Sequence, residues 1–300
     1  MKVKILLQGI LLTTCMSMLS CGGDGRKPLD TQSGSLVLSQ FKTQMAGIPT
    51  SNTTPTMVGA SMGLGGVSMS SFGAKAMSCQ TLTPNPTKDA DQDGIAAEIV
   101  NTYDCTDTAS GGSTYTMKGT VKFVDLDETV KGVYGGMRGE FNIPTITVTS
   151  GGFSFNYSHV GFWEYKNVDG ALKSTSEYTG GMAAEEHGMK LDYKYSQKWA
   201  YTMTPADKSK PFDAGTLDMT GSFSMTGDFV IEDSSGKHQP YNGTWVISYN
   251  TKDLTYDRTC SQHYKTGSFI MSDSMNTMEL KYECTKATLY VNGVESDWWK

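Results

Sequence analysis

A two-residue alternation of apolar and polar side chains dominates the chain from about residue 115 to residue 294. It is clearest in Tyr115–Phe123, Met189–Met203 and Leu217–Ile231. In the second of these stretches most odd positions hold Met, Leu, Tyr or Trp, whereas most even positions hold Lys, Asp, Ser or Thr. Successive side chains of a β-strand point to opposite faces, so the alternation indicates strands with one buried and one wetted face, and therefore antiparallel pairing.

Further strands are predicted between turn sequences such as Ser150-Gly151-Gly152, Val168-Asp169-Gly170 and Asn292-Gly293. They cover Gly136–Ile143, Thr145–Thr149, Gly152–Lys166, Tyr241–Thr251, Thr266–Ser272, Thr277–Cys284 and Ala287–Val294. About ten long strands bury an apolar face only when their sheet curls or folds onto itself. We therefore expect an all-β fold, a large antiparallel meander that closes as a barrel or a sandwich. The pattern alone leaves open a transmembrane barrel, in which the apolar side chains face lipid.

The N-terminus has the features of a secretory signal peptide. Lys2 and Lys4 precede a mostly apolar stretch, Ile5–Leu19, which is too short and too polar to span a bilayer. The segment Met18-Leu19-Ser20-Cys21, followed by three glycines and an aspartate, resembles the lipobox of bacterial lipoproteins.

That resemblance implies cleavage before Cys21, which would then carry a diacylglycerol and an N-linked acyl chain. Two or more acyl chains anchor a protein firmly, so we expect a protein tethered to the membrane. Gly22 stands where an aspartate would signal retention in the inner membrane, so the resemblance implies the cell envelope, at the outer membrane of a Gram-negative cell. The alternative is an ordinary signal peptide followed by a structural Cys21.

Four parts are expected along the chain. Residues 1–20 are the signal peptide. Residues 21–78 are rich in Gly, Ser, Thr and Met, which is typical of a flexible tether. Residues 79–112 form a small calcium-loop and disulfide element, and residues 113–300 form the antiparallel β domain.

Four cysteines follow the lipobox, namely Cys79, Cys105, Cys260 and Cys284. In an exported protein an even number favours disulfides. We favour Cys79 with Cys105 and Cys260 with Cys284, because each pairing closes a local loop. A zinc site is the alternative, although no pair has the short spacing that zinc ligands show, and free thiols are a third.

The segment Asp89-Ala90-Asp91-Gln92-Asp93-Gly94-Ile95 alternates carboxylates with other residues and then turns at a glycine. Calcium binds about six to eight hard oxygens, and such a loop supplies several of them. The stretch up to Cys105 resembles the calcium-binding thrombospondin type 3 repeats. We therefore predict a calcium ion held by Asp89, Asp91, Asp93, the Ile95 carbonyl and Glu98. The alternative is a solvated acidic turn that opens a helix-like stretch from Ile95 to Tyr103.

Other candidate sites are weaker. The 300 residues have a net charge of -6 and no basic run, which argues against nucleic-acid binding. No catalytic set is recognised, because His159, His187, His238 and His263 lack metal-ligand spacing and are predicted to be surface or cross-strand residues.

Three functions remain. The first is a non-catalytic, lipid-anchored protein with a calcium-stabilised β body that is structural or adhesive, with an envelope protein or a surface ligand as its partner. The second is a β-barrel carrier of a hydrophobic ligand, received by an aromatic and Met-rich interior. The third is an enzyme. Core and cross-strand packing is the simpler explanation of the aromatic residues.

Overall fold

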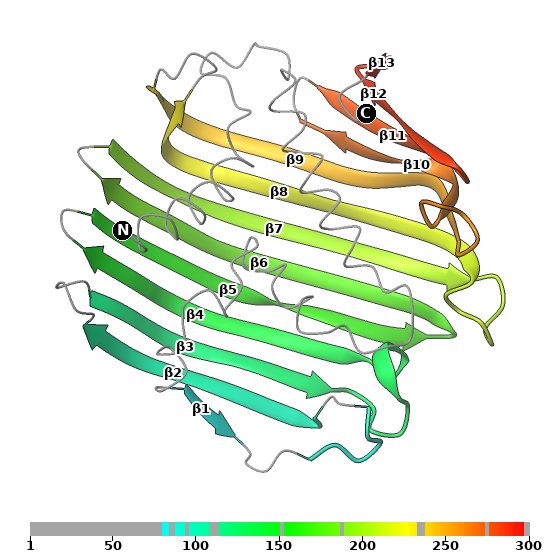
Figure 1. The fold of residues 1–300 in the computed structure, drawn as a ribbon, viewed down its shortest axis with the longest axis horizontal. Coiled ribbons are helices and arrows are strands. Elements are labelled where there is room, and N and C mark those ends of the chain that lie inside the picture. Colours follow the sequence, from blue (N-terminus) through cyan, green and yellow to red (C-terminus); the bar gives the residue numbers. More distant parts are fainter. Residues whose placement is uncertain are drawn as a thin grey trace.

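A computed structural model describes residues 80–83, 88–93, 96–108, 114–150, 153–186, 189–232, 238–273 and 276–296. These residues form one 13-stranded sheet, in which every strand pairs with its neighbours in the chain (Figure 1). The strands are β1 (Gln80–Thr83), β2 (Glu98–Thr108), β3 (Thr114–Asp125), β4 (Met137–Ser150), β5 (Phe153–Val168), β6 (Ala171–Glu186), β7 (Met189–Pro205), β8 (Ala214–Glu232), β9 (His238–Asp257), β10 (Tyr264–Ser272), β11 (Thr277–Glu283), β12 (Lys286–Val291) and β13 (Val294–Ser296). A short 3-10 helix, η4 (Gly132–Tyr134), lies between β3 and β4.

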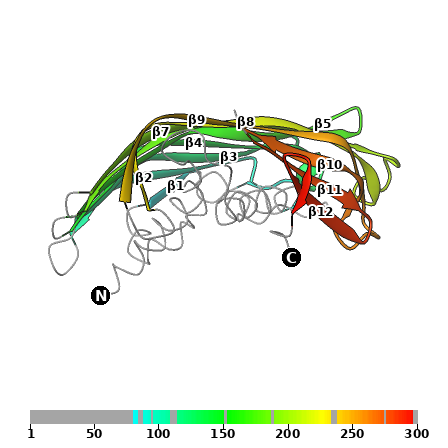
Figure 2. The ribbon, with the colours of Figure 1, turned by 90° about the horizontal axis from the view of Figure 1, so that it is seen from above.

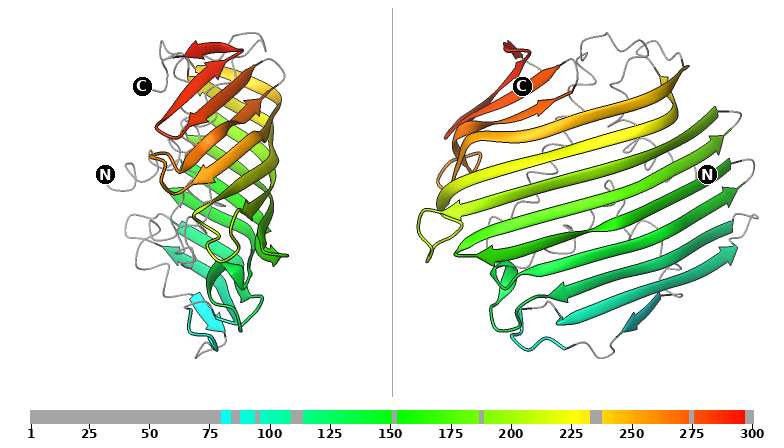
Figure 3. Two further views of the ribbon diagram at one scale, coloured as in Figure 1. Left: turned by 90° about the vertical axis from the view of Figure 1, so that its right-hand side faces the viewer. Right: turned by 180° about the vertical axis from the view of Figure 1, so that it is seen from behind.

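The sheet is an open, curved meander. All of its strand pairs are antiparallel, with β1 at one edge and β13 at the other (Figure 3). Figure 2 shows that β1 to β9 form an arch and that β10 to β12 bend toward its concave side. The predicted antiparallel meander is confirmed, whereas the described strands do not close into a barrel.

Local irregularities accompany this curvature. The register shifts between Lys118 and Thr120 on β3 and between Ile143 and Ile146 on β4. An unpaired residue of this kind bends a strand and increases its twist. Gly119 lies at the first irregularity with φ +144°, and a Cβ there would collide with the Asn142 carbonyl oxygen, so only glycine fits.

One face of the sheet is buried, as the alternation predicts. On β3, Met117 and Val121 are buried, whereas Lys118 between them is exposed. The same alternation places Tyr193, Tyr201 and Met203 of β7 and Leu217, Met219 and Met225 of β8 on the buried face. Most of these side chains belong to one apolar cluster that reaches from β2 to β12.

Strand β6 is absent from the predicted strands, although the turn before it was expected. Both central residues of that turn, Asp169 and Gly170, have positive φ, as a tight two-residue hairpin requires. Two of the buried positions of β6 hold Ser174 and Ser176, which hide the apolar alternation. These small side chains lie directly opposite large ones, because Ser176 pairs with Trp163 on one side and Trp199 on the other.

The predicted boundary between residues 112 and 113 falls inside the sheet. Strand β2 pairs with β3 from Glu98↔Val124 to Thr108↔Thr114, so the two belong to one body. Residues 98–103, expected on one alternative to be helix-like, are extended. Tyr103 and Cys105 are buried and their neighbours Thr102 and Asp104 are exposed, which is the same alternation in a stretch where it is harder to recognise.

Cys260 and Cys284 form a disulfide, as predicted. It joins the turn between β9 and β10 to the turn between β11 and β12. The Ser261 backbone N–H donates a hydrogen bond to the Cys284 carbonyl, 3.0 Å away, which reinforces the same connection. Cys105 is disulfide-bonded as well, while Cys79 lies outside the described residues, so the pairing of these two stays a prediction.

Candidate metal centre

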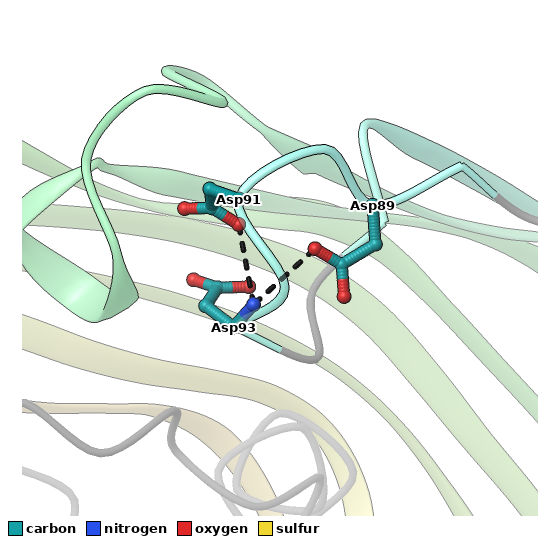
Figure 4. Close-up of side chains that lie close together, drawn as sticks. All are labelled: Asp89, Asp91 and Asp93. Carbon is teal, nitrogen blue, oxygen red and sulfur yellow. Dashed lines mark hydrogen bonds between the residues drawn. The ribbon is translucent and has the colours of Figure 1, made fainter.

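The acidic segment ahead of β2 folds into a compact loop held by its own first aspartate. The Asp89 Oδ1 atom accepts hydrogen bonds from the backbone N–H group of Gln92 at 2.7 Å and from that of Asp93 at 3.2 Å, the second of which is drawn in Figure 4. The Asp93 N–H also donates to Asp91 Oδ1 at 3.2 Å. Gln92 has φ +61°, so the chain reverses direction within the loop. The predicted ligands Asp89, Asp91 and Asp93 are thereby gathered on one turn.

These three carboxylates lie within reach of a single ion. One oxygen from each of Asp89, Asp91 and Asp93 falls within 4.8 Å of the others. Two oxygens on opposite sides of a calcium ion are at most about 5 Å apart, since each lies roughly 2.4 Å from the ion. The spacing of the carboxylates is therefore compatible with calcium.

The structure adds two acids from elsewhere in the chain. Asp125, the last residue of β3, and Glu128, in the turn that follows, form a second group with Asp91, again within 4.8 Å. We call Asp89, Asp91, Asp93, Asp125 and Glu128 the acidic cluster.

Two hydrogen bonds hold the loop against the turn between β3 and β4. The Ala90 N–H donates to Glu128 Oε2 at 2.6 Å, across 38 residues of sequence. The Gly132 N–H donates to Asp93 Oδ2 at 2.6 Å. The cluster thus lies where the first loop meets the body of the sheet, and each segment orients an acid of the other.

Three of the five acids in the cluster have no basic partner among the residues that the structure describes. Within the part of the chain that the structure describes, no Lys or Arg forms an ion pair with Asp91, Asp125 or Glu128. Burial, and then the nearby Asp93, Glu128 and Asp91 charges, raise the pKa of Asp125. Burial and the Asp93 charge likewise raise the pKa of Asp91. A bound cation would relieve both effects.

The remaining predicted ligands have different outcomes. Ile95 and Gly94 lie outside the described residues. The Glu98 Oε2 atom lies 2.6 Å from Lys122 Nζ, and Glu98 belongs to neither group of the cluster. Glu98 therefore lies outside the two groups of acids, and its role as a metal ligand stays a prediction.

The sequence contained one signal for Asp125. The alternation of Tyr115–Phe123 places odd residues on the buried face, and continuing it by one step places a carboxylate at a buried position. A buried carboxylate needs a partner, which a hydrogen-bond donor or a metal ion supplies. The sequence does not predict that Asp125 lies next to Asp91, because the spacing of the residues does not show which turn folds against the 88–93 loop.

The other candidate residues have separate outcomes. Cys21 and the proposed tether are outside the described residues. His159 is fully buried on β5, where its Nδ1 lies 2.6 Å from the Tyr195 hydroxyl, and His263 is exposed in the turn before β10.

Comparisons of the chain with models of known families, with curated proteins and with solved structures found no match. Among the described residues there is no helix of the length and hydrophobicity that a membrane crossing requires.

Proposed function

We propose that this chain is a non-catalytic, lipid-anchored protein of the cell envelope whose β body is stabilised by calcium and has a structural or adhesive role. The observation that carries the proposal is the acidic cluster, in which carboxylate oxygens from the 88–93 loop and from the end of β3 lie within 4.8 Å of one another in two groups that share Asp91. Such a set of hard oxygens suits calcium better than a soft transition metal.

The location of the cluster suggests what the ion does. It would join the first loop of the body to the turn after β3, next to the N-terminal edge of the sheet. Without a cation, like charges oppose this contact. With one, the contact becomes favourable, so calcium would stabilise the body at the end that follows the predicted tether.

The sequence supports the anchoring part of the proposal. The lipobox-like Met18-Leu19-Ser20-Cys21 precedes about sixty residues of Gly- and Ser-rich chain, which is long enough to hold the body away from the membrane. The exposed face of the sheet carries many Lys, Asp, Ser and Thr side chains and is the surface available to an envelope protein or surface ligand.

Calcium removal tests the proposal. We expect millimolar calcium to raise the thermal unfolding temperature of the full mature chain relative to EDTA, because an ion that binds only the folded state adds about 2.7 kcal/mol at a hundred times its Kd. The variant Asp91→Ala should show no such rise. Thermal unfolding followed by circular dichroism measures both.

The matched control is Asp218→Asn, which removes an exposed carboxylate on β8, far along the chain from the cluster. It should respond to calcium as the wild-type protein does. A wild-type protein whose unfolding temperature is the same in calcium and EDTA would contradict the calcium part of the proposal.

A carrier of a hydrophobic ligand is the second candidate. One observation favours it: the buried face is rich in Tyr, Trp and Met, and the Trp163 indole N–H and the Ser176 hydroxyl on it have no hydrogen-bond partner among the described residues. A ligand with one polar group among apolar ones would suit such a surface. Organic extraction of the purified protein, followed by mass spectrometry, distinguishes the two functions, since only a carrier should yield a stoichiometric hydrophobic compound.

A further inference from the structure

We infer that the acidic cluster binds two divalent cations of the calcium type, and that Asp91 bridges them. The first ion is the one proposed above, held by Asp89, Asp91 and Asp93. The second is held by Asp91, Asp125 and Glu128 and depends on the fold rather than on the loop sequence. This inference rests on the proposed calcium-binding function and goes further in the number of ions and the residues that hold them.

The geometry divides the cluster into two groups with one common member. Each group of three has one oxygen per residue within 4.8 Å of the others, and Asp91 alone belongs to both. A bridging carboxylate can give one oxygen to each ion. The Asp91 Oδ1 atom faces the loop, where it accepts the Asp93 N–H, whereas its Oδ2 atom is buried.

An independent observation points to a ligand at the second group. Asp125 is only 7% exposed, and its Oδ2 atom is buried with no hydrogen-bond donor in the part of the chain that the structure describes. The other Asp125 oxygen accepts the Asp127 backbone N–H at 2.9 Å, which fixes the orientation of the carboxylate. A buried carboxylate oxygen without a partner is costly, so a native structure rarely keeps one without a function.

The same condition holds for every member of the second group. Asp91 Oδ2, Asp125 Oδ2 and Glu128 Oε1 are all buried, and none of them has a hydrogen-bond partner among the described residues. The second oxygen of Glu128 accepts the Ala90 N–H, so this side chain is also held in place. Three buried, oriented and unpartnered oxygens, one from each acid, form the kind of arrangement that a hard cation completes.

The second ion would connect parts of the protein that the first does not. The first ion is bound within a single loop, whereas the second joins that loop to the end of β3. Binding of the second ion therefore docks the loop on the sheet. Because Asp91 takes part in both sites, occupation of one should affect the affinity of the other.

Calcium stoichiometry tests this inference on the full mature chain in detergent. Isothermal titration with calcium chloride should show that Asp125→Asn and Glu128→Gln each bind one ion fewer than the wild-type protein, or bind it at least tenfold more weakly. Asp89→Asn should lose the other ion, and Asp91→Asn should lose both. The matched control is Asp127→Asn, because Asp127 is an exposed acid of the same turn whose Oδ1 atom bonds Thr129. It should keep the wild-type stoichiometry.

A second measurement guards against variants that fold poorly. In EDTA, Asp125→Asn should unfold at a higher temperature than the wild-type protein, because it removes a buried charge that other acids repel, whereas Asp127→Asn should not. The two-ion inference is overturned if Asp125→Asn and Glu128→Gln bind as much calcium as the wild-type protein with unchanged affinity. If the wild-type protein binds one ion that only Asp89→Asn and Asp91→Asn lose, the inference fails and the proposed function stands. If the wild-type protein binds none, both fail.

Discussion

The surroundings of His159, rather than the imidazole itself, determine how this residue titrates. It has no exposed surface, and its Nδ1 lies 2.6 Å from the Tyr195 hydroxyl, which lies 2.9 Å from the Tyr157 hydroxyl. The Tyr178 ring stacks on the imidazole with centroids 4.9 Å apart. Burial lowers the pKa of His159 to about 4. The groups that face it are tyrosines and Phe141, and none is an acid that would favour the charged form.

This lowered pKa predicts a loss of stability in acid. In the unfolded chain the histidine has its ordinary pKa of about 6.5, so below that pH the unfolded state takes up a proton that the folded state does not. The stabilisation is therefore complete above pH 6.5 and is lost as the pH falls to about 4, by up to about 3 kcal/mol. His159→Leu should reduce the difference in unfolding free energy between pH 7 and pH 4.5 by a comparable amount.

Urea unfolding of both proteins at the two pH values provides the comparison. Carboxylates also titrate in this range, so the quantity to compare is the difference between wild type and variant at each pH. If the variant loses as much stability on acidification as the wild-type protein does, His159 is not the source.

At the scale of elements, strand β6 shows that the apolar–polar alternation of a strand also depends on the side chains of the strands that pair with it. Two of its buried positions hold serines, Ser174 and Ser176, because β5 and β7 place large rings on both sides of them. Gly180 lies between His159 of β5 and Tyr195 of β7. A Cβ on Gly180 would collide with the Ser158 carbonyl oxygen and lie 2.5 Å from the Tyr195 hydroxyl oxygen. The absence of a side chain here is what allows the tyrosine and histidine to meet.

Two single substitutions at adjacent glycines, compared with each other, test this packing. Gly180→Ala should destabilise the protein by about 1–3 kcal/mol, the typical cost of overpacking a filled core. The adjacent Gly181 is the matched control, because a Cβ there meets its nearest atom, the Tyr193 carbonyl oxygen, at 3.3 Å. Gly181→Ala should change the free energy of unfolding by less than about 1 kcal/mol. Equal effects of the two substitutions in urea unfolding would argue against the packing role of Gly180.

For the molecule as a whole, the sheet continues without interruption from β1 to β13. The predicted calcium element is therefore an edge of the β body rather than a separate unit, since β2 pairs with β3 over its full length. The body would be held at this edge by the cations proposed here, and near the other edge by the Cys260–Cys284 disulfide.

Attachment to the membrane gives a prediction for the whole chain. When the protein is expressed with its own signal in a bacterial host, the wild-type product should enter the detergent phase in a phase-separation assay, because its acyl chains bind the micelles. Cys21→Ser should remain in the aqueous phase, and mass spectrometry should find it without acyl groups. Cys15→Ser is the control, since Thr14 precedes that cysteine and makes it a poorer acceptor; it should behave like the wild type. The opposite result for the two variants would move the lipidation site to Cys15.

The sequence by itself determined the periodic features of this protein: the antiparallel strands, which residues of Tyr115–Phe123 or Met189–Met203 are buried, the Cys260–Cys284 pair and the turn that gathers Asp89, Asp91 and Asp93. Each depends on residues close together in the chain or on the two-residue period of a strand. Only the tertiary structure decided that β6 is a strand, that β2 belongs to the sheet, that the sheet stays open, and that Asp125 and Glu128 join Asp91 while Glu98 pairs with Lys122. These outcomes depend on which segments lie side by side in the sheet. Strand pairing and sheet curvature decide this, and both arise from contacts between residues that are far apart in the chain.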